Sequence, residues 1–301
     1  MNITPNNERR RLFRRLEDNL PPLELTERDL SILGYIRDYR FLNTAQIAAL
    51  VGGSYHNVSE RLSRLFHHGY LDRPAHQRDL RADGYRVMIY AIAPKGAAAL
   101  AREAGEVPVI SRHMSEDNRT ARRFYLAHTL MISQFRVCLE LAVRARPDLE
   151  LALWKVPQRP LARVPIGRER VAVIPDAHFI LKNAEGAYAH FFLEADRGTM
   201  SQKRFLAKLQ SYWQLRSRIY VNDIPSAFRV LTIAESERRM ENLIATAVDA
   251  DPRRRGSGMF CFAAETDYSL EDPEALFRAI WRTPADPFPL SILNHGGGRH
   301  D

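Results

Sequence analysis

The stretch that decides the fold is residues 43–67, which read NTAQIAALVGGSYHNVSERLSRLFH. Asn43 is a residue type that caps helices, and the Gly-Gly-Ser run at 52–54 ends one helix and opens the next. Apolar residues of the second helix then recur at helical spacing and predict a face turned to a core, namely Val58, Leu62 and Leu65. The stretch therefore predicts two helices joined by a tight turn.

The outward side of the second helix carries polar and charged side chains. They are Ser54, His56, Asn57, Glu60, Ser63, Arg64 and His67. Side chains that donate and accept hydrogen bonds suit a helix that reads base edges in the major groove. Glu60 would repel phosphates, but its carboxylate is able to accept from a cytosine amino group. These residues are therefore predicted to bind DNA.

A helix precedes this stretch and a hairpin follows it. Thr26, with Asp29 three positions later, predicts the start of the first helix. Residues 70–73 and 86–92 predict two strands joined by a polar segment. Basic side chains in this segment are placed to contact sugar and phosphate: Arg78, Arg81 and Arg86. We interpret residues 25–105 as a winged helix-turn-helix, a module that most often binds DNA but also serves protein interaction and dimerisation.

Residues 1–24 form a basic N-terminal arm in this interpretation. Arginines of the arm are predicted to neutralise phosphates, among them Arg10, Arg11 and Arg14. The alternative is a solvated amphipathic helix through Leu12, Phe13 and Leu16. The chain has 44 Lys and Arg against 36 Asp and Glu, a formal net charge of +8. This excess favours polyanionic partners without separating DNA from RNA or a membrane surface.

Composition predicts an ordinary water-soluble protein. Hydrophobic residues make up 45% of the chain and charged residues 27%, which permits substantial cores and argues against a membrane protein. We see no apolar run near the length of a transmembrane span and no signal peptide, so we expect a cytoplasmic protein without a membrane partner. Cys138 and Cys261 are expected to be buried thiols rather than a disulfide or metal ligands.

Residues 112–285 predict a second domain, after a break at 105–109. Helices and strands alternate along it: a helix at about 116–144, strands at 149–154, at 171–174 with 177–180 and at 190–194, a helix at 200–216, a strand at 228–233, a helix at 235–248 and a strand at 259–263. This order predicts a central sheet covered by helices, so the fold class of the chain is α/β (mixed α+β). The tail at 286–301 is expected to be disordered.

Carboxylates on neighbouring strands of the predicted sheet are candidates for a site. Asp176 is predicted at the middle of one strand segment and Glu194 near the end of the next. Buried carboxylates are costly unless they are paired or bind a cation, and oxygen ligands suit Mg²⁺. The sequence thus predicts a Mg²⁺ or Mn²⁺ site formed by Asp176, Glu194 and Asp196. The alternative is a set of structural ion pairs with Arg197 or Arg204.

The order of elements, with Pro175-Asp176 and Glu194-Ala195-Asp196, resembles the PD-(D/E)xK nuclease fold. In that fold two acids hold a metal that activates water, helped by a lysine two residues after the second acid. Here that position is Asp196, so the resemblance implies the fold more strongly than the activity. Lys203 or Lys208 on the following helix would supply the missing charge, unless both lie on its solvated face.

The winged helix followed by Pro175-Asp176 and residues 194–199, with Lys208 and Tyr212 downstream, resembles the replication-relaxation proteins of plasmids and other mobile elements. The likeness covers roughly residues 25 to 235. It implies an accessory factor of plasmid replication and mobilisation that binds double-stranded DNA. A relaxase, replication or coupling proteins are the partners it implies. The DNA binding itself requires no cofactor, and the sequence leaves a homodimer open.

Three functions therefore compete. The first is a non-catalytic origin-binding factor with a degenerate nuclease-like domain. The second is a metal-dependent DNA endonuclease, which cleavage of supercoiled plasmid with Mg²⁺ or Mn²⁺ would separate from the others. The third is a winged-helix transcriptional regulator whose second domain senses a ligand. A relaxase is not among them, because the sequence has no clustered histidine triad beside a nucleophilic tyrosine.

Overall fold

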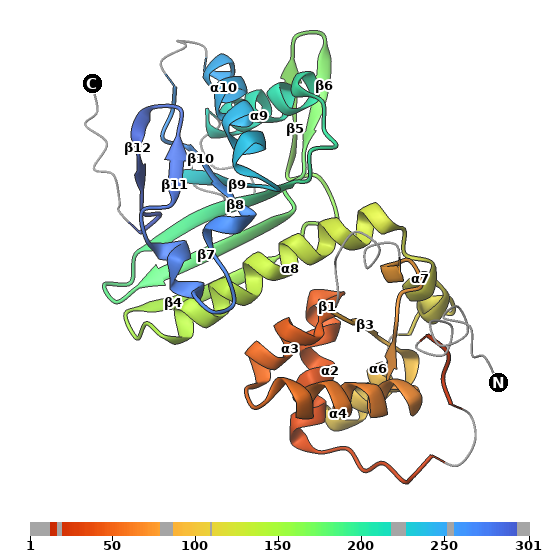
Figure 1. Cartoon of the computed structure of the whole chain (residues 1–301). Coiled ribbons are helices and arrows are strands. Elements are labelled where there is room, and N and C mark those ends of the chain that lie inside the picture. Colours follow the sequence, from red (N-terminus) through yellow and green to blue (C-terminus); the bar gives the residue numbers. More distant parts are fainter. Residues whose placement is uncertain are drawn as a thin grey trace, which may run out of the picture. The chain divides into compact units, whose positions relative to one another are not determined.

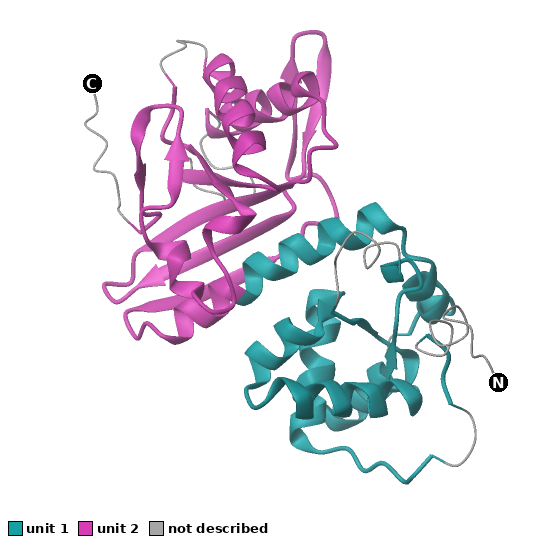
Figure 2. Cartoon of the chain, viewed as in Figure 1, with its two compact units in different colours: residues 1–137 teal, residues 138–301 magenta. Residues whose placement is uncertain are grey.

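The computed structural model divides into two compact units, Met1–Val137 and Cys138–Asp301 (Figure 2). The division falls inside helix α8 (Arg123–Arg144), whereas the linker predicted at 105–109 lies between α6 (Pro94–Glu103) and α7 (Met114–Thr120). The structure describes residues 13–16, 20–78, 87–108, 110–217, 227–251 and 256–293.

Unit 1 combines helices with a three-stranded antiparallel sheet of order β1-β3-β2 (Figure 1). Ahead of α6 and α7 its elements are α2 (Glu27–Tyr39), β1 (Leu42–Asn43), α3 (Thr44–Val51), α4 (Tyr55–His67), β2 (Leu71–Asp72) and β3 (Ile89–Ile92). The helices and strands predicted within 25–105 are therefore present. Residues 79–86, with the predicted Arg81 and Arg86, lie outside the described residues.

The three helices α2, α3 and α4 begin at the capping residues that the sequence predicted. Thr26 and Asp29 form a capping box, in which Asp29 Oδ2 accepts from the Thr26 backbone at 2.8 Å. Asn43 forms a second box with Gln46, with both hydrogen bonds at 2.9 Å. Ser54 Oγ accepts from a backbone N–H of α4 at 3.2 Å. Each cap stabilises its helix by about 1 kcal/mol because it satisfies an N–H that has no partner within the helix.

The apolar side of each of these helices faces the core of unit 1. The buried side chains include Ile32, Leu33, Ile36, Ile47, Leu50, Val58, Leu62 and Leu65. Burial of each such side chain contributes about 1.5–3 kcal/mol. The polar sides of the helices therefore face solvent, and the polar side chains of α4 lie on such a side.

The single helix predicted at 116–144 is in fact two helices, α7 and α8. Ala121 leaves the helical conformation, with ψ at 117°. Asn118 near the end of α7 is buried, and its Nδ2 donates to Ile92 O at 2.7 Å and to Asp72 Oδ2 at 3.0 Å. The prediction of one continuous helix was wrong because the partners of Asn118 lie in β2 and β3, which are distant in sequence. The local sequence pattern does not predict these contacts.

Helix α8 is long and apolar enough to cross a membrane, judged by length and composition alone, and within the described parts of the chain it is the one such helix. The expectation that no apolar run approaches that length was therefore wrong. In the structure 56% of its apolar window is buried. Core helices of water-soluble proteins share this length and burial.

Unit 2 is built on a seven-stranded mixed sheet of order β12-β11-β10-β9-β8-β7-β4 (Figure 1). Strands β8, β9 and β10 are parallel to one another, and the other neighbouring pairs are antiparallel. The strands are β4 (Leu149–Lys155), β7 (Ala177–Asn183), β8 (Tyr188–Asp196), β9 (Phe228–Ala234), β10 (Phe260–Ala264), β11 (Trp281–Thr283) and β12 (Asp286–Leu290). The predicted mixed α/β class, with a large central sheet and helices, is confirmed.

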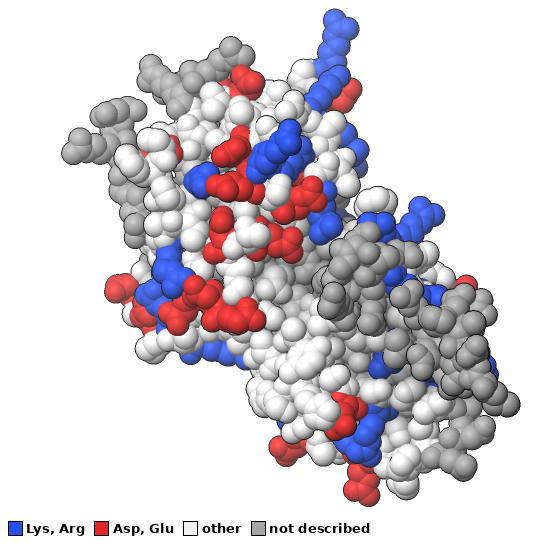
Figure 3. All heavy atoms as spheres, viewed as in Figure 1, with Lys and Arg blue, Asp and Glu red and all other residues white. Residues whose placement is uncertain are grey.

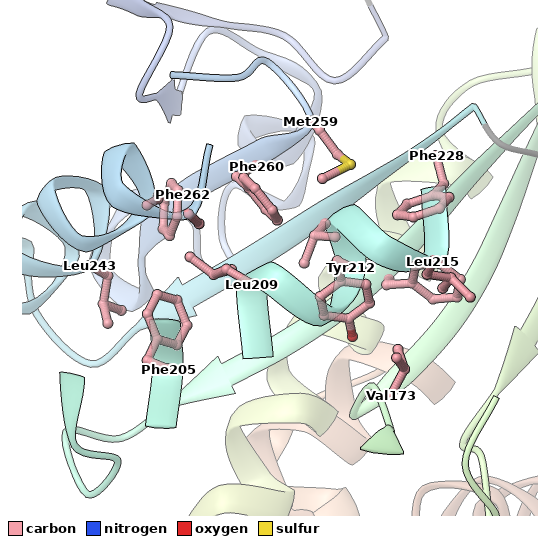
Figure 4. Close-up of a cluster of buried hydrophobic side chains, with 14 of the residues drawn as sticks. Val173, Phe205, Leu209, Tyr212, Leu215, Phe228, Leu243, Met259, Phe260 and Phe262 are labelled. Atoms are coloured by element: carbon pink, nitrogen blue, oxygen red, sulfur yellow. The ribbon is translucent and has the colours of Figure 1, made fainter. Parts of the chain in front are cut away.

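Helices α9 (Gln202–Arg216) and α10 (Glu237–Ala250) pack on one face of this sheet. Figure 4 shows Leu209 and Tyr212 of α9 in one cluster with Phe228 of β9 and Phe260 of β10. The ring of Phe192 joins them, with its centroid 5.7 Å from that of Tyr212 and 4.9 Å from that of Phe228. This aromatic packing fixes α9 over β8 and β9.

Residues 171–180, predicted as one strand segment, belong to two sheets. Strand β6 (Glu169–Val173) pairs with β5 (Ala162–Ile166) in a separate hairpin, and β7 begins at Ala177. Pro175, which has no N–H, lies in the connection. Asp176 therefore precedes β7, and its predicted place at the middle of a strand was wrong.

The predicted disordered tail at 286–301 starts too early. Asp286–Leu290 forms β12, which pairs with β11. The turn between the two strands is closed by Asp286, whose backbone N–H donates to Thr283 Oγ1 at 3.2 Å. Residues 294–301 lie outside the part that the structure describes. Cys138 and Cys261 are buried free thiols, as predicted.

Candidate functional site

Helix α4 presents four exposed polar side chains: His56, Asn57, Glu60 and Arg64. We call these four the α4 surface. His56 Nε2 lies 3.5 Å from Glu60 Oε1 one turn away, and both side chains are more than half exposed. The apolar residues of the same helix are buried on its other side. The α4 surface is therefore held by a packed helix and stays accessible to a ligand.

The other predicted residues of α4 have partners within the protein. Ser54 caps the helix, and Ser63 Oγ accepts from Arg73 Nη2 at 3.3 Å. His67 Nδ1 accepts from the Leu16 backbone N–H at 3.1 Å. Burial and the neighbouring Arg73 lower the pKa of His67, which favours the neutral ring that this hydrogen bond needs. These three residues thus help to hold unit 1 together as well as lying near the α4 surface.

Residues 13–16 are the described part of the predicted basic arm, and they form a turn and a bend rather than a helix. Arg15 is held against the body of unit 1. Its guanidinium donates to Phe66 O at 3.0 Å, to Leu71 O at 2.9 Å and to Asp72 Oδ1 at 2.6 Å. Arg14 is exposed. Arg15 therefore docks the arm, and Arg14 is the arginine of this part that faces solvent.

Arg78 is exposed after β2, and its guanidinium carbon lies 5.2 Å from the centroid of the Phe13 ring. The structure thus brings the start of the predicted wing next to the arm. The other basic residues predicted to contact phosphate fall outside the described residues, namely Arg10, Arg11, Arg81 and Arg86.

In unit 2 the structure brings Asp176, Glu194 and Lys208 together, with Tyr212 beside them. Glu194 is 3% exposed, and its Oε2 accepts from Lys208 Nζ. Its Oε1 accepts from the Tyr212 hydroxyl at 2.5 Å. Asp176 Oδ2 accepts from the Ala195 backbone N–H at 2.8 Å. We call Glu194, Lys208 and Tyr212 the Glu194 cluster; both oxygens of its carboxylate have partners within the protein.

Burial dominates the electrostatics of the Glu194 cluster. It raises the pKa of Glu194 to about 7, although the charge of Lys208 acts in the opposite direction. Burial alone would lower the pKa of Lys208, but its attraction to Glu194 and Asp176 outweighs burial and raises it. Burial and the nearby Glu194 also raise the pKa of Tyr212 well above its usual value. Lys208 is thus a permanent cation beside a carboxyl group that titrates near neutral pH.

Asp196 lies two residues beyond Glu194 on the same strand and has a different partner. Arg239 of α10 binds it through two hydrogen bonds, from Nε to Oδ1 at 2.7 Å and from Nη2 to Oδ2 at 3.0 Å. The Gly198 N–H also donates to Oδ1, at 2.8 Å. The expected partners Arg197 and Arg204 were wrong choices, because the packing of α10 on the sheet brings Arg239 there.

The three carboxylates predicted as metal ligands do not converge. Among the residues that the structure describes, no group of three or more His, Cys, Asp or Glu side chains is arranged to hold a metal ion. Glu194 is bound by Lys208 and Tyr212, and Asp196 by Arg239. These residues fit a divalent metal poorly in this arrangement. Lys203, the alternative lysine, is exposed on α9.

Charge on the surface of unit 2 is mixed. On the face that Figure 3 shows, Lys and Arg side chains are interspersed with Asp and Glu. Among the described residues of that face, basic side chains form no continuous stripe of the kind that binds a nucleic acid backbone. The exposed polar residues of α4 are therefore the clearer candidate for an interface.

The fold and the site define a two-unit α+β protein with a capped polar helix in one unit and a buried carboxylate, lysine and tyrosine in the mixed sheet of the other. The chain belongs to the replication-relaxation family, whose model matches residues 33–227. The match includes α4, Asp176 and the Glu194 cluster. No curated protein and no solved structure shows significant similarity to the chain. Membership in this family indicates a role in the replication or relaxation of plasmids or other mobile elements.

Proposed function

We propose that the protein is a DNA-binding accessory factor in the replication or mobilisation of a plasmid or other mobile element. Unit 1 acts as a winged helix, with α4 in the major groove of double-stranded DNA. The order α2, β1, α3, α4, β2, β3 and the antiparallel sheet β1-β3-β2 support this assignment.

The proposal rests mainly on the α4 surface. Its side chains lie on a helix whose opposite side is buried, so a rigid element presents them. Asn57 offers the amide that pairs with adenine, and Arg64 offers the guanidinium that pairs with guanine. Exposed Arg14 and Arg78 then contact phosphates and strengthen binding to any sequence.

Unit 2 has a supporting role in this proposal. Acids of a PD-(D/E)xK-like domain are retained just before β7 and on β8, but the Glu194 carboxylate is held by Lys208 and Tyr212. The partners of the protein are a relaxase, replication proteins or coupling proteins, and the site of action is the cytoplasm, where plasmid DNA replicates. DNA binding by unit 1 needs no metal.

The test is a salt-controlled titration of the full chain with DNA fragments from the replication origin of its own element. Changing Asn57 and Arg64 together to alanine is expected to weaken specific binding by about 1–3 kcal/mol for each base that is no longer recognised. Arg102→Ala is the matched control, because it removes an exposed arginine from the last turn of another helix of unit 1. Unchanged binding by the double variant would disprove the proposed role of α4.

A second function, a metal-dependent endonuclease, is favoured by the proximity of Asp176, Glu194 and Lys208. Incubation of supercoiled plasmid with Mg²⁺ or Mn²⁺ tests it, and we expect no nicking and no rise in melting temperature with metal. A metal that binds only the folded state would raise that temperature. Robust nicking that is abolished in Asp176→Ala and Glu194→Ala, and kept in the exposed-residue control Lys203→Ala, would establish the endonuclease instead.

A further inference from the structure

A hollow of about 570 Å³ lies in unit 2, beside β4, β7 and β8 and the segment 156–161. Its polar side chains come from Lys155, Gln158, Arg159, His178 and His190, and its apolar walls include Leu153 and Ile180. Neither the nuclease-like acids nor the α4 surface forms part of it. A volume of this size, with mostly apolar walls and a few convergent polar groups, is typical of a small-molecule site.

The register of the sheet brings these residues to one face. Lys155 of β4 is paired with His178 of β7, and Ile180 of β7 with His190 of β8. Residues paired across strands share a face of the sheet, as do alternate residues of one strand. Glu194 is four residues beyond His190 on β8, so the hollow and the Glu194 cluster lie on the same face.

The two imidazoles are in direct contact. His178 Nε2 lies 3.4 Å from His190 Nδ1, and the rings are stacked with centroids 5.6 Å apart. Burial, His190 and Lys155 lower the pKa of His178 to about 4, and burial lowers the pKa of His190. Both rings are therefore neutral at pH 7. In a neutral pair joined by one hydrogen bond, one of the two outer ring nitrogens still carries a proton that it is able to donate.

The charges beside the imidazoles select an anion rather than a metal cation. Lys155 and Arg159 line the same hollow, and no Asp or Glu does. Two neighbouring cations repel a metal ion, and the described residues supply no third ligand of the usual types. The donors here are instead those that bind phosphate oxygens: a lysine ammonium, an arginine guanidinium and an imidazole N–H.

We propose that this hollow binds a nucleotide. Its phosphate lies among Lys155, Arg159 and the donating imidazole, and its base rests against Leu153 and Ile180. The nucleotide is either a free mononucleotide or the 5′-phosphorylated end of a DNA strand, since both carry a phosphate monoester. The proposal is independent of the DNA contacts of α4, because every residue of the hollow belongs to unit 2.

Calorimetric titration of the full chain with deoxyadenosine monophosphate, deoxyadenosine and inorganic phosphate tests this site. We expect the monophosphate to bind at least about tenfold more tightly than deoxyadenosine, because the nucleoside has no phosphate to accept charge-assisted hydrogen bonds. Inorganic phosphate should compete with it. A short DNA strand with and without a 5′-phosphate separates the two sources. Tighter binding of the phosphorylated strand than of both the unphosphorylated strand and the mononucleotide identifies a strand end, and equal binding of the two strands identifies a free nucleotide.

Two variants localise the binding. Lys155→Met removes an exposed cation, and His178→Gln removes the buried ring; each should weaken binding of the monophosphate at least about tenfold. Lys182→Met is the matched control, since that partly exposed lysine of β7 pairs with Glu150 at 3.1 Å, outside the hollow, and should not change binding. Absence of binding to the wild-type chain, or full binding by Lys155→Met, would overturn the proposal. The Asn57 and Arg64 double variant should bind the monophosphate as the wild type does. The proposed DNA binding by α4 and the proposed nucleotide binding by the hollow are therefore tested independently.

Discussion

The α4 surface and the Glu194 cluster both contain charged residues, but in opposite physical states. On α4, Asn57, Glu60 and Arg64 are exposed to water. In unit 2, Glu194 is 3% exposed and both of its oxygens accept hydrogen bonds from within the protein. The spacing of charged residues in a sequence therefore identifies only a candidate ligand site. Whether those side chains are able to bind a ligand depends on the hydrogen bonds they already make within the protein.

The two regions also differ in what their side chains contribute to stability. A buried ion pair that loses one member leaves an uncompensated charge in a medium of low polarity, which costs far more than loss of an exposed pair. The buried acids of β8 should therefore affect unfolding strongly, and the residues of α4 should affect DNA binding with little effect on unfolding.

Asp196→Ala should cause the largest loss of stability. It removes a carboxylate whose side chain is 5% exposed and leaves the guanidinium of Arg239, whose side chain is 16% exposed, without its carboxylate partner. We expect a decrease in the free energy of unfolding of about 3–5 kcal/mol, measured by urea denaturation.

The matched control is Asp148→Ala, which breaks the exposed pair with Arg146, whose side chains are 48% and 34% exposed. It should leave the urea midpoint nearly unchanged. Equal losses for Asp196→Ala and Asp148→Ala would mean that the burial of the Asp196 pair has no energetic consequence, and the contrast would fail.

Glu194→Gln should change the pH dependence of stability. The folded pKa of Glu194 is about 7 and its ordinary value is 4.5, so between these values the folded chain binds more protons than the unfolded chain. The stability that Glu194 contributes is therefore fully present below about pH 4.5 and is lost as pH rises through 7. The slope is at most about 1.4 kcal/mol per pH unit.

The measurement is the difference in free energy of unfolding between wild type and Glu194→Gln, taken from pH 5 to 8 in half-unit steps. We expect the advantage of the wild type to shrink as pH rises to about 7 and to level off above it. A difference that grows with pH would show that Lys208 outweighs burial and lowers the pKa of Glu194. Lys203→Met, on the exposed side of α9, is the control and should leave the slope as it is in the wild type.

Glu60→Gln should have the smallest effect. The side chain is 66% exposed, so the free energy of unfolding should change by less than about 0.5 kcal/mol. Removal of a negative charge from the α4 surface should strengthen binding to random-sequence DNA by a few-fold at about 50 mM salt and by less at about 200 mM. Weaker binding to all sequences, measured by fluorescence anisotropy, would show that α4 does not face the phosphates.

The helix ends of unit 1 and the buried side of α4 could be predicted from the sequence, because each depends on residues that are close together along the chain. Thr26 and Asn43 cap helices through residues three positions away, and Gly52, with φ at 70°, ends α3 in a conformation that favours glycine. The spacing of Val58 and Leu62 likewise determined which side of α4 is buried and which side is polar. For the same reason the short apolar runs of the second domain predicted most strands of the central sheet.

Only the tertiary structure decided which groups meet across the chain. Lys208 reaches Glu194 because α9 packs over β8, and Arg239 reaches Asp196 because α10 packs beside it. The exposed Lys203 is an equal candidate by sequence alone. Strand pairing similarly assigned residues 171–173 to a separate hairpin and extended the sheet to Asp286–Leu290. A sequence determines the local preferences of each segment, whereas the pairing of distant charges depends on how whole helices and strands pack, because burial makes an unpartnered charge too costly to keep.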